Sequence, residues 1–138
     1  MGKGLAFPLC IQTVTLYHPD PENGTVTRRV VAGVFLDRRV KMNFTETGCQ
    51  AARAFLLVIP AAAGEPGDAY TLEPGDRVFE GTGPELSWQE WPDFVPAMRQ
   101  GVCCVQYVDP KTVRGRFSHL EAGGWWTRSG GGAHSLTN

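Results

Sequence analysis

The sequence predicts a mainly β protein, a small antiparallel β-barrel or sandwich with long loops and a flexible C-terminal tail. Short segments rich in β-branched and aromatic residues recur along the chain, at spacings typical of a closed or nearly closed antiparallel sheet. Turn signals separate them, since the 17 glycines and 10 prolines exceed average usage and favour many turns over long helices. Neither an internal repeat nor a heptad pattern competes with this interpretation.

The first two expected strands form a hairpin near the N-terminus. Residues 12–18 are rich in alternating β-branched and aromatic types, so they predict a strand. Asn23-Gly24 in the turn that follows is the strongest short hairpin signal in the chain. The next β segment spans 25–40, and Gly33 within it predicts a bulge or a sharp bend. We expect 41–53 to be a loop with at most one helical turn.

The middle of the chain contains its most apolar run, 54–60. This run is short and ends at a proline, which predicts a buried strand and not a helix. Residues 61–70 are expected to form a flexible loop. Pro74-Gly75 fits the two central positions of a type II turn, because proline presets the first φ and glycine supplies the positive second one. A strand over residues 77–80 is expected next.

An irregular excursion and two further strands are expected in the last third of the chain. The excursion covers 82–100, with a short helix from Asp93. A strand at 101–109 is followed by a turn at Pro110-Lys111 and by a last strand at 114–121.

Length, composition and charge limit the function classes. At 138 residues and 15.1 kDa, the chain can bury roughly two-thirds of its unfolded surface, so it needs no disulfide or metal to fold. We expect a β-barrel domain at 12–122, between an N-terminal arm at 1–11 and a flexible Gly/Ser-rich tail at 123–138. The net charge of −1 argues against a protein that coats nucleic acid and against a membrane-surface helix. The chain lacks an apolar run of membrane-spanning length and has a poor signal peptide, so we expect the protein in a cytoplasm.

No set of residues predicts catalysis, a cofactor or a metal site, and we do not expect an enzyme. A cysteine nucleophile beside His119 is a weaker interpretation than a packed core thiol next to an edge histidine. A solvated acidic face explains Glu85, Glu90 and Asp93 better than a pair of glycosidase carboxylates. No C-x-x-C motif occurs, and adjacent cysteines in a strand point to opposite faces, so free thiols are expected. The cysteines are Cys10, Cys49, Cys103 and Cys104.

A nucleic-acid-binding β-barrel is an alternative of another class. Bases would then stack on Phe35, Tyr107 and Phe117, next to basic residues. The basic residues are Arg38, Arg39, Arg114 and Arg116. The competing interpretation places the three rings in the barrel core and the arginines on its outside.

Large aromatic residues outside the expected strands predict surfaces for partners. Exposed tryptophan is enriched at protein interfaces, where it acts as an anchor. In one interpretation the loop and the tail dock against partners; in the other, the loop folds back and caps an open end of the barrel. The sequence leaves both open. The residues concerned are Trp88, Trp91 and Phe94 in the loop and Trp125 and Trp126 in the tail.

Six segments follow one another in a recognisable order. They are Thr13–Tyr17, Thr27–Asp37, Val58–Pro60, Pro74–Gly81, Val105–Asp109 and His119–Gly124. In this order and spacing they resemble a family of small structural proteins encoded in the head–tail gene module of phages from Firmicutes. That family often has tryptophan where His119 and Leu120 lie, which does not disturb the rest of the match.

The resemblance implies a virion component of the neck, assembled in the host bacterial cytoplasm. Head-completion or stopper proteins of such phages are commonly small β-barrels with long loops, which form rings below the portal and adaptor. A tail terminator, a tail-tube protein and a minor capsid or decoration protein are the implied alternatives. In a neck ring we expect Glu85, Glu90 and Asp93 to face the channel and DNA to make only passive contact. The partners would be further copies of the chain, the portal-adaptor complex and the terminator or tail-tube proteins, without a membrane.

Overall fold

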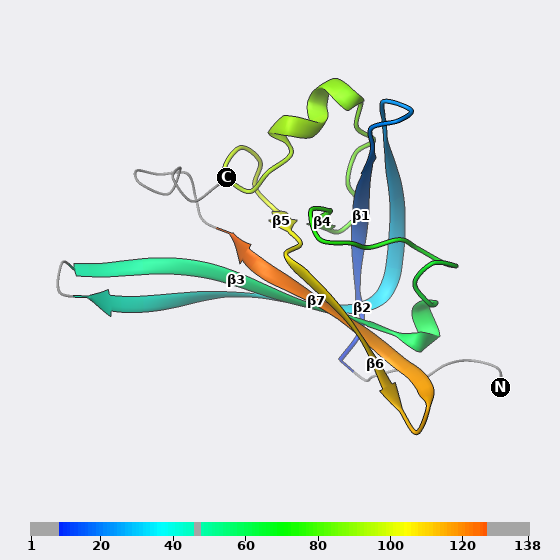
Figure 1. The fold of residues 1–138 in the computed structure, drawn as a ribbon. Coiled ribbons are helices and arrows are strands. Elements are labelled where there is room, and N and C mark those ends of the chain that lie inside the picture. Colours follow the sequence, from blue (N-terminus) through cyan, green and yellow to red (C-terminus); the bar gives the residue numbers. More distant parts are fainter. Residues whose placement is uncertain (1–8, 46–47, 127–138) are drawn as a thin grey trace.

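The computed structural model describes residues 9–45 and 48–126, with side chains at 9–39 and 53–124. Its strands form one curled antiparallel sheet in the order β5-β4-β1-β2-β3-β7-β6 (Figure 1). The expected mainly β class and antiparallel, barrel-like architecture are confirmed. The strands are β1 (Gln12–Asp20), β2 (Thr25–Thr45), β3 (Gly48–Pro60), β4 (Arg77–Glu80), β5 (Val102–Cys104), β6 (Tyr107–Val113) and β7 (Arg116–Trp126), with two short 3-10 helices, η1 (Ala61–Ala63) and η2 (Trp88–Asp93).

The sheet has two halves, one formed by β5, β4, β1 and the first part of β2, the other by the second part of β2, β3, β7 and β6. Two segments of the chain each contribute to both halves. The first part of β2 pairs with β1, and its second part pairs with β3. In the same way, β5 pairs with β4 and β6 pairs with β7, although only Val105 and Gln106 separate β5 from β6. The Val105 N–H donates to the Asp76 carbonyl (2.9 Å) and the Gln106 N–H donates to the Gly123 carbonyl (2.8 Å). Between these two hydrogen bonds, the chain passes from β5, at one end of the strand order, to β6, at the other end.

Gly33 lies where β2 changes partner. Gln12 is opposite Val34 and Thr13 is opposite Ala32, so Gly33 is the extra residue of a β-bulge. Its φ of +78° lies in the left-handed region, which glycine adopts without steric cost. The Gln12 side chain fixes the bend by accepting from the Leu36 N–H (2.9 Å) and donating to the Leu36 carbonyl (3.2 Å). The predicted bulge is confirmed.

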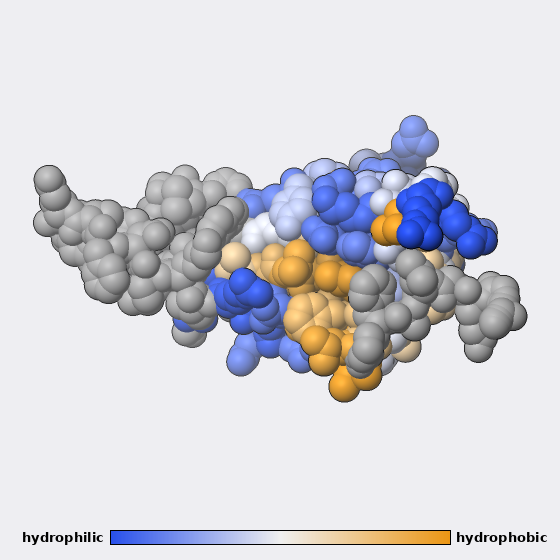
Figure 2. All heavy atoms as spheres, turned by 90° about the horizontal axis from the view of Figure 1, so that it is seen from below, coloured by the Kyte–Doolittle hydropathy of each residue, from blue (hydrophilic) through white to orange (hydrophobic). Residues whose placement is uncertain are grey.

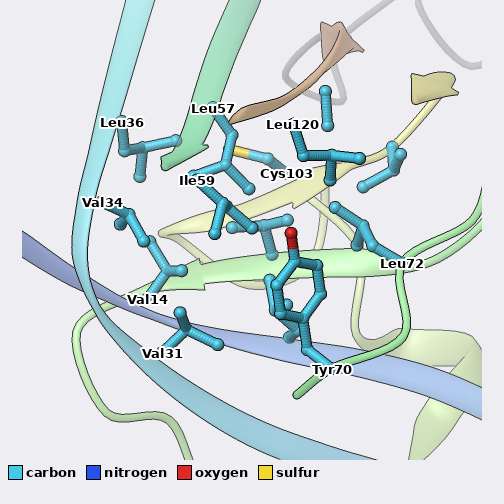
Figure 3. Packing of buried hydrophobic residues seen from close by; sticks show 14 of the residues in the cluster. Val14, Val31, Val34, Leu36, Leu57, Ile59, Tyr70, Leu72, Cys103 and Leu120 are labelled. Carbon is cyan, nitrogen blue, oxygen red and sulfur yellow. The ribbon is translucent and has the colours of Figure 1, made fainter. Parts of the chain in front are cut away.

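The main hydrophobic core lies inside the curl (Figure 3). Side chains alternate between core and exterior along each strand: Phe55, Leu57 and Ile59 of β3 are buried, whereas Leu56 and Val58 are half-buried on the outer face. Tyr70 and Leu72, from the segment before β4, also enter the core. The other labelled core residues in Figure 3 are Val14, Val31, Val34, Leu36, Cys103 and Leu120.

The turn before β4 forms as its sequence predicts. The Asp76 N–H donates to the Glu73 carbonyl (3.0 Å), and Gly75 has a φ of +96°. The strand expected at 77–80 is β4, and it pairs with β1 on one side and β5 on the other. The sequence signal therefore located both the turn and the strand.

The expected loop at 41–53 is wrong, because β2 and β3 continue through it as a two-stranded hairpin. Backbone pairing runs from Val40 opposite Arg53 to Thr45 opposite Gly48. Figure 1 shows this ribbon extending away from the rest of the sheet. We call residues 40–45 and 48–52 the hairpin arm. Alternating apolar and polar residues at 40–45 are typical of a strand, and this pattern prevails over the loop-forming character of Asn43 and Gly48.

Two boundaries near the C-terminus also differ from expectation. Strand β6 continues through Pro110-Lys111, where a turn was expected, and the turn lies at Arg114-Gly115, with φ values of +55° and +76°. Pro110 is tolerated because β6 pairs with β7 alone, so an edge position does not need its N–H. Strand β7 reaches Trp126, past the boundary expected at 123. The rest of the expected tail, 127–138, lies outside the described residues, as do 1–8 of the N-terminal arm.

Close packing explains the glycines inside β7. A Cβ atom on Gly123 would lie 2.7 Å from atoms of the Tyr107 ring, and one on Gly124 would lie 2.6 Å from the Cys104 carbonyl oxygen. These glycines allow another segment to approach the strand, so they do not mark a flexible tail.

Candidate functional site

The 82–100 excursion folds back over the outer face of the half-sheet formed by β1, β4 and β5. Tyr17, Phe94 and Val102 form a second, smaller buried cluster there. The Tyr17 and Phe94 rings meet edge to face, with centroids 4.6 Å apart. The Tyr17 hydroxyl donates to the Pro84 carbonyl (2.6 Å), and the Arg77 guanidinium donates to the Phe94 carbonyl (2.8 Å). The excursion is thus part of the folded body.

This arrangement corrects the expected role of Phe94. Its side chain is only 2% exposed, so it anchors the excursion to the chain's own sheet and is not presented to a partner. Trp91 is half-buried and packs against the same cluster, with the Arg77 guanidinium 4.2 Å from its ring centroid. Trp88 is also half-buried and begins η2. Of the three aromatic residues predicted in this loop, the two tryptophans retain accessible surface.

The three acidic residues predicted to line a channel are all exposed on this excursion: Glu85, Glu90 and Asp93. Glu90 has a local structural partner. Its carboxylate accepts from the Ser87 N–H (2.8 Å), and its own N–H donates to the Ser87 hydroxyl (3.2 Å), a capping box that starts η2. The hydrogen bond from the Ser87 N–H lowers the pKa of Glu90. The helix therefore begins at Trp88, five residues before the expected start at Asp93, and the Ser-x-x-Glu motif is the sequence signal that marks it.

The other half-sheet is formed by the second part of β2 with β3, β7 and β6. Its outer face is different, because no strand or helix of the described residues covers it. Phe35 and Val58 are opposite each other there, and Leu56 follows on the same face. We call Phe35, Leu56 and Val58 the apolar patch. Figure 2, which views the molecule from below, shows hydrophobic surface gathered near the middle and the lower edge of the picture.

Polar pairs surround the apolar patch on the same face. Each pair joins an acidic residue to a basic one two positions away on the same strand, and in the two pairs with Arg and Lys the charges are compensated locally. An apolar centre inside a polar rim is the usual anatomy of a protein interface. The pairs are Asp37–Arg39 (2.5 Å), Asp109–Lys111 (2.8 Å) and Glu121–His119 (3.2 Å).

The hairpin arm has a second apolar face, which follows from its backbone register. Val40, Met42 and Phe44 occupy alternate positions of β2, and Phe44 and Met42 are opposite Cys49 and Ala51 of β3. Directly opposite residues of an antiparallel pair share a face, so these five positions lie on one side of the ribbon. The same side carries Leu36 and Leu57 farther along β2 and β3, where both are buried in the core. The core-facing side of the sheet therefore continues along the arm beyond the barrel.

Trp125 and Trp126 lie at the base of the hairpin arm. In β7 they are opposite Ala54 and Arg53, respectively. Their predicted role in a partner interface stays a prediction, since only their backbone positions are described. The register nevertheless places Trp126 on the same side of the sheet as the apolar positions of the arm, because it is opposite Arg53, which is opposite Val40.

A hydrogen-bonded pair at one end of the barrel was missed by the sequence analysis. His18 Nδ1 lies 2.8 Å from Oδ1 of Asp76, and Oδ2 of Asp76 accepts from the Glu73 N–H (2.9 Å). Burial raises the pKa of Asp76, although both hydrogen bonds oppose this. His18, but not Asp76, also lines a cavity of about 230 Å³, together with Arg29, Asp68 and Tyr70, among others. Because Asp76 has a polar partner for each oxygen within the fold, its geometry suits a structural role.

The residues considered for nucleic-acid binding do not form one surface. Phe35 and Tyr107 lie on the outer face, whereas Phe117 packs against the core. The interpretation that places all three rings in the core is therefore wrong for Phe35 and Tyr107. Arg38 pairs with Glu80 (2.6 Å), on the core-facing side of β2, and Arg39 pairs with Asp37. The outer face around Phe35 and Tyr107 contains acidic as well as basic groups, a mixture that does not attract a polyanion.

The cysteines and the histidines do not converge in the part of the chain that the structure describes. Cys103 is fully buried, and burial raises its pKa to about 12, whereas its neighbour Cys104 is half-buried on the other face of β5. No three His, Cys, Asp or Glu side chains among the described residues gather where they could hold a metal ion. Within residues 9–45 and 48–126, no helix is long and apolar enough to cross a membrane.

Comparison with known proteins identifies one family. A family model described as "Family of unknown function (DUF6751)" matches residues 9–125, and the chain belongs to this family. The match covers all seven strands except the last residue of β7. No curated protein and no solved structure matches the chain.

Proposed function

We propose that this member of the DUF6751 family is a structural subunit of a phage neck, a connector or stopper ring that joins the portal-adaptor complex to the tail. The resemblance to head–tail module proteins suggests the location. The observation that carries the proposal is the pair of apolar surfaces on one small barrel: the hairpin arm, which extends from the body, and the apolar patch. A protein that works alone gains nothing from either surface, whereas a subunit of an assembly can bury both.

The hairpin arm supports an assembly role on energetic grounds. An isolated two-stranded hairpin is at best marginally stable in water, because one face has no layer to pack against. Along 40–45 and 48–52, the described strands pair only with each other. A partner that covers the apolar side of the arm would supply the missing layer. Long extensions that become fully packed only in the assembled particle suit a ring protein.

The excursion at 82–100 offers a second surface, which we assign to the rings above or below. Trp88 and Trp91 are half-buried, and Glu85, Glu90 and Asp93 are exposed beside them. In this proposal the acidic side chains face the channel, where they would repel DNA and allow it to pass. Buried Phe94 holds the excursion in place from beneath.

Composition of purified virions tests the proposed location. Phage particles, DNA-filled heads without tails and free tails are separated, and the copies of this protein in each are counted by quantitative mass spectrometry. A ring-like count retained on tailless full heads is the expected result. The same count only on free tails would indicate a tail terminator instead. Many copies would indicate a tube or decoration protein, and absence from all particles would overturn the virion role.

A variant phage adds a functional readout. Trp88→Ala removes an aromatic residue that lies outside the buried cluster, so the protein should remain folded while joining of heads to tails falls. Gln89→Ala, at an exposed neighbouring position of η2, is the matched control. Normal joining with Trp88→Ala would exclude this surface from the docking contact.

A further inference from the structure

The apolar patch and the apolar side of the hairpin arm lie on opposite faces of the same two strands. The patch includes Phe35 and Val58, which are directly opposite each other on the outer face of β2 and β3. The apolar side of the arm continues the inner face of these strands, the one that carries Leu36 and Leu57. Because one pair of strands forms both, the two surfaces cannot fold onto each other within a single chain.

We propose that the hairpin arm of one copy packs on the apolar patch of the next copy, so that the chain associates head to tail. This inference rests on the proposed function and names the partner that builds the ring. The contact would be sheet on sheet: the inner face of the arm lies on the outer face of β2 and β3 of its neighbour. Two apolar faces stacked in this way reproduce the packing of a β-sandwich.

The charges of the two surfaces allow this contact. In sequence, the stretch 40–52 contains one Lys and one Glu, so its net charge is zero. Asp37 and Asp109 at the rim of the patch each have a cationic neighbour on their own strand, and Glu121 lies 3.2 Å from the His119 imidazole. Neither surface repels the other, and burial of apolar area drives the association. The affinity should therefore persist in high salt, which screens ion pairs and leaves apolar burial intact.

The geometry of the contact determines the kind of assembly. A contact between two different surfaces leaves one free arm and one free patch on every complex. Growth then continues until a ring closes, or it produces a filament where the rotation does not close. An arm-to-arm or a patch-to-patch contact would instead stop at a dimer. Counting copies therefore distinguishes this proposal from the simpler alternatives.

Two charge substitutions test the contact in the full-length protein. Phe44→Asp disables the arm and Leu56→Asp disables the patch, each by placing a carboxylate in an apolar contact. Asn43→Asp, on the opposite side of the arm by register, and Thr82→Asp, on the exposed excursion, are the matched controls. Native mass spectrometry and sedimentation are recorded over a concentration series, and circular dichroism with thermal unfolding checks that each protein is folded.

The expected result has three parts. The wild type and both controls form complexes larger than dimers, whereas each apolar-to-charge variant associates at least about tenfold more weakly. A mixture of the two variants forms a one-to-one heterodimer that grows no further. The intact arm of the Leu56→Asp protein and the intact patch of the Phe44→Asp protein are both used in that contact, and the other arm and patch are disabled. A wild type that stays monomeric at its highest soluble concentration would overturn the contact. So would a Leu56→Asp protein that assembles as the wild type does.

Failure of this inference is separable from failure of the proposed function. Ring-like copy numbers in virions together with a monomeric purified protein would overturn the arm-to-patch contact and support the neck role. Assembly that depends on Phe44 and Leu56, together with absence from virions, would support the contact and overturn the neck role.

Discussion

His18 Nδ1 lies 2.8 Å from Oδ1 of Asp76, which joins the first strand to the turn that precedes β4. Asp76 is 1% exposed, and its second oxygen accepts the Glu73 N–H of the same turn. One carboxylate thus stabilises a local turn and ties it to a residue 58 positions earlier in the sequence. The pair fixes the register at which the chain re-enters the sheet after the long connection that follows β3.

Asp76→Ala should lower the free energy of unfolding by about 2 kcal/mol, because it removes the buried carboxylate that bonds both the Glu73 N–H and His18 Nδ1. Asp76→Asn keeps an oxygen for the turn and should cost less. Urea denaturation of the three proteins at neutral pH measures both differences. Equal stability of the Ala variant and the wild type would contradict a structural role for the carboxylate.

Lowering the pH should raise the free energy of unfolding of the wild type relative to that of Asp76→Asn. Burial raises the pKa of Asp76 above its unfolded value, so the folded protein binds the proton more tightly than the unfolded chain does. The stabilisation from this group is therefore complete below the unfolded pKa and is lost as the pH rises through the folded pKa. Urea titrations from neutral to acidic pH should show the stability difference moving in favour of the wild type as the pH falls.

The control for this pH experiment is a second pair of proteins, both with His18→Gln. The other carboxyl groups are common to both members of each pair and cancel in the difference. With the imidazole removed, the remaining pH dependence belongs to Asp76. A difference that moves in favour of the Asn variant at low pH would mean that hydrogen bonding, and not burial, governs this carboxyl group.

Phe94→Ala should destabilise the protein by about 3 to 5 kcal/mol, the usual cost of removing a buried aromatic ring. Tyr17→Phe should cost only about 1 kcal/mol, since it keeps the ring and loses the hydrogen bond to Pro84. Thermal unfolding and hydrogen exchange over 82–100 measure both effects. A Phe94→Ala protein with wild-type stability and unchanged protection from hydrogen exchange would contradict the anchoring role and leave Phe94 available to a partner.

Gly33→Ala should cost about 1 to 2 kcal/mol, because a Cβ disfavours the left-handed backbone that the bulge requires. Beyond Gly33 and its two chain neighbours, no atom lies within 4 Å of that Cβ, so the cost arises from the backbone and not from a clash. Gly33→Asn should cost less, since asparagine tolerates positive φ better than alanine does. Equal losses for the two variants, measured by denaturation, would contradict this explanation.

Local signals predicted the parts of the fold that depend on local chemistry. Gly33 predicted the bulge, and Pro74-Gly75 predicted the type II turn. The apolar run at 54–60 predicted the buried part of β3. In each case a few adjacent residues determine the backbone conformation. The same kind of signal, Ser87 three residues before Glu90, was present for η2.

Features that depend on distant segments were not predictable in this way. Gly123 and Gly124 have the composition of a loose tail, and only the approach of Tyr107 and Cys104 explains their place inside a strand. Phe94 lies in a polar, proline-containing stretch, and its burial depends on Tyr17 of the first strand. The apolar patch is equally non-local, because it forms only when β2 pairs with β3. Alternation along 40–45 was the one available signal for the hairpin arm.

The uninterrupted course of β2 has a mechanical consequence. From Thr25 to Thr45 a single strand runs from the first hairpin, through the bend at Gly33, to the end of the hairpin arm. Its hydrogen bonds to β1 and β3 lie across the strand direction. A tensile load applied along the arm would therefore shear many of these bonds at once and would not open them one by one. A particle that holds its tail through such arms would share the pull between head and tail among the sheets of all its subunits.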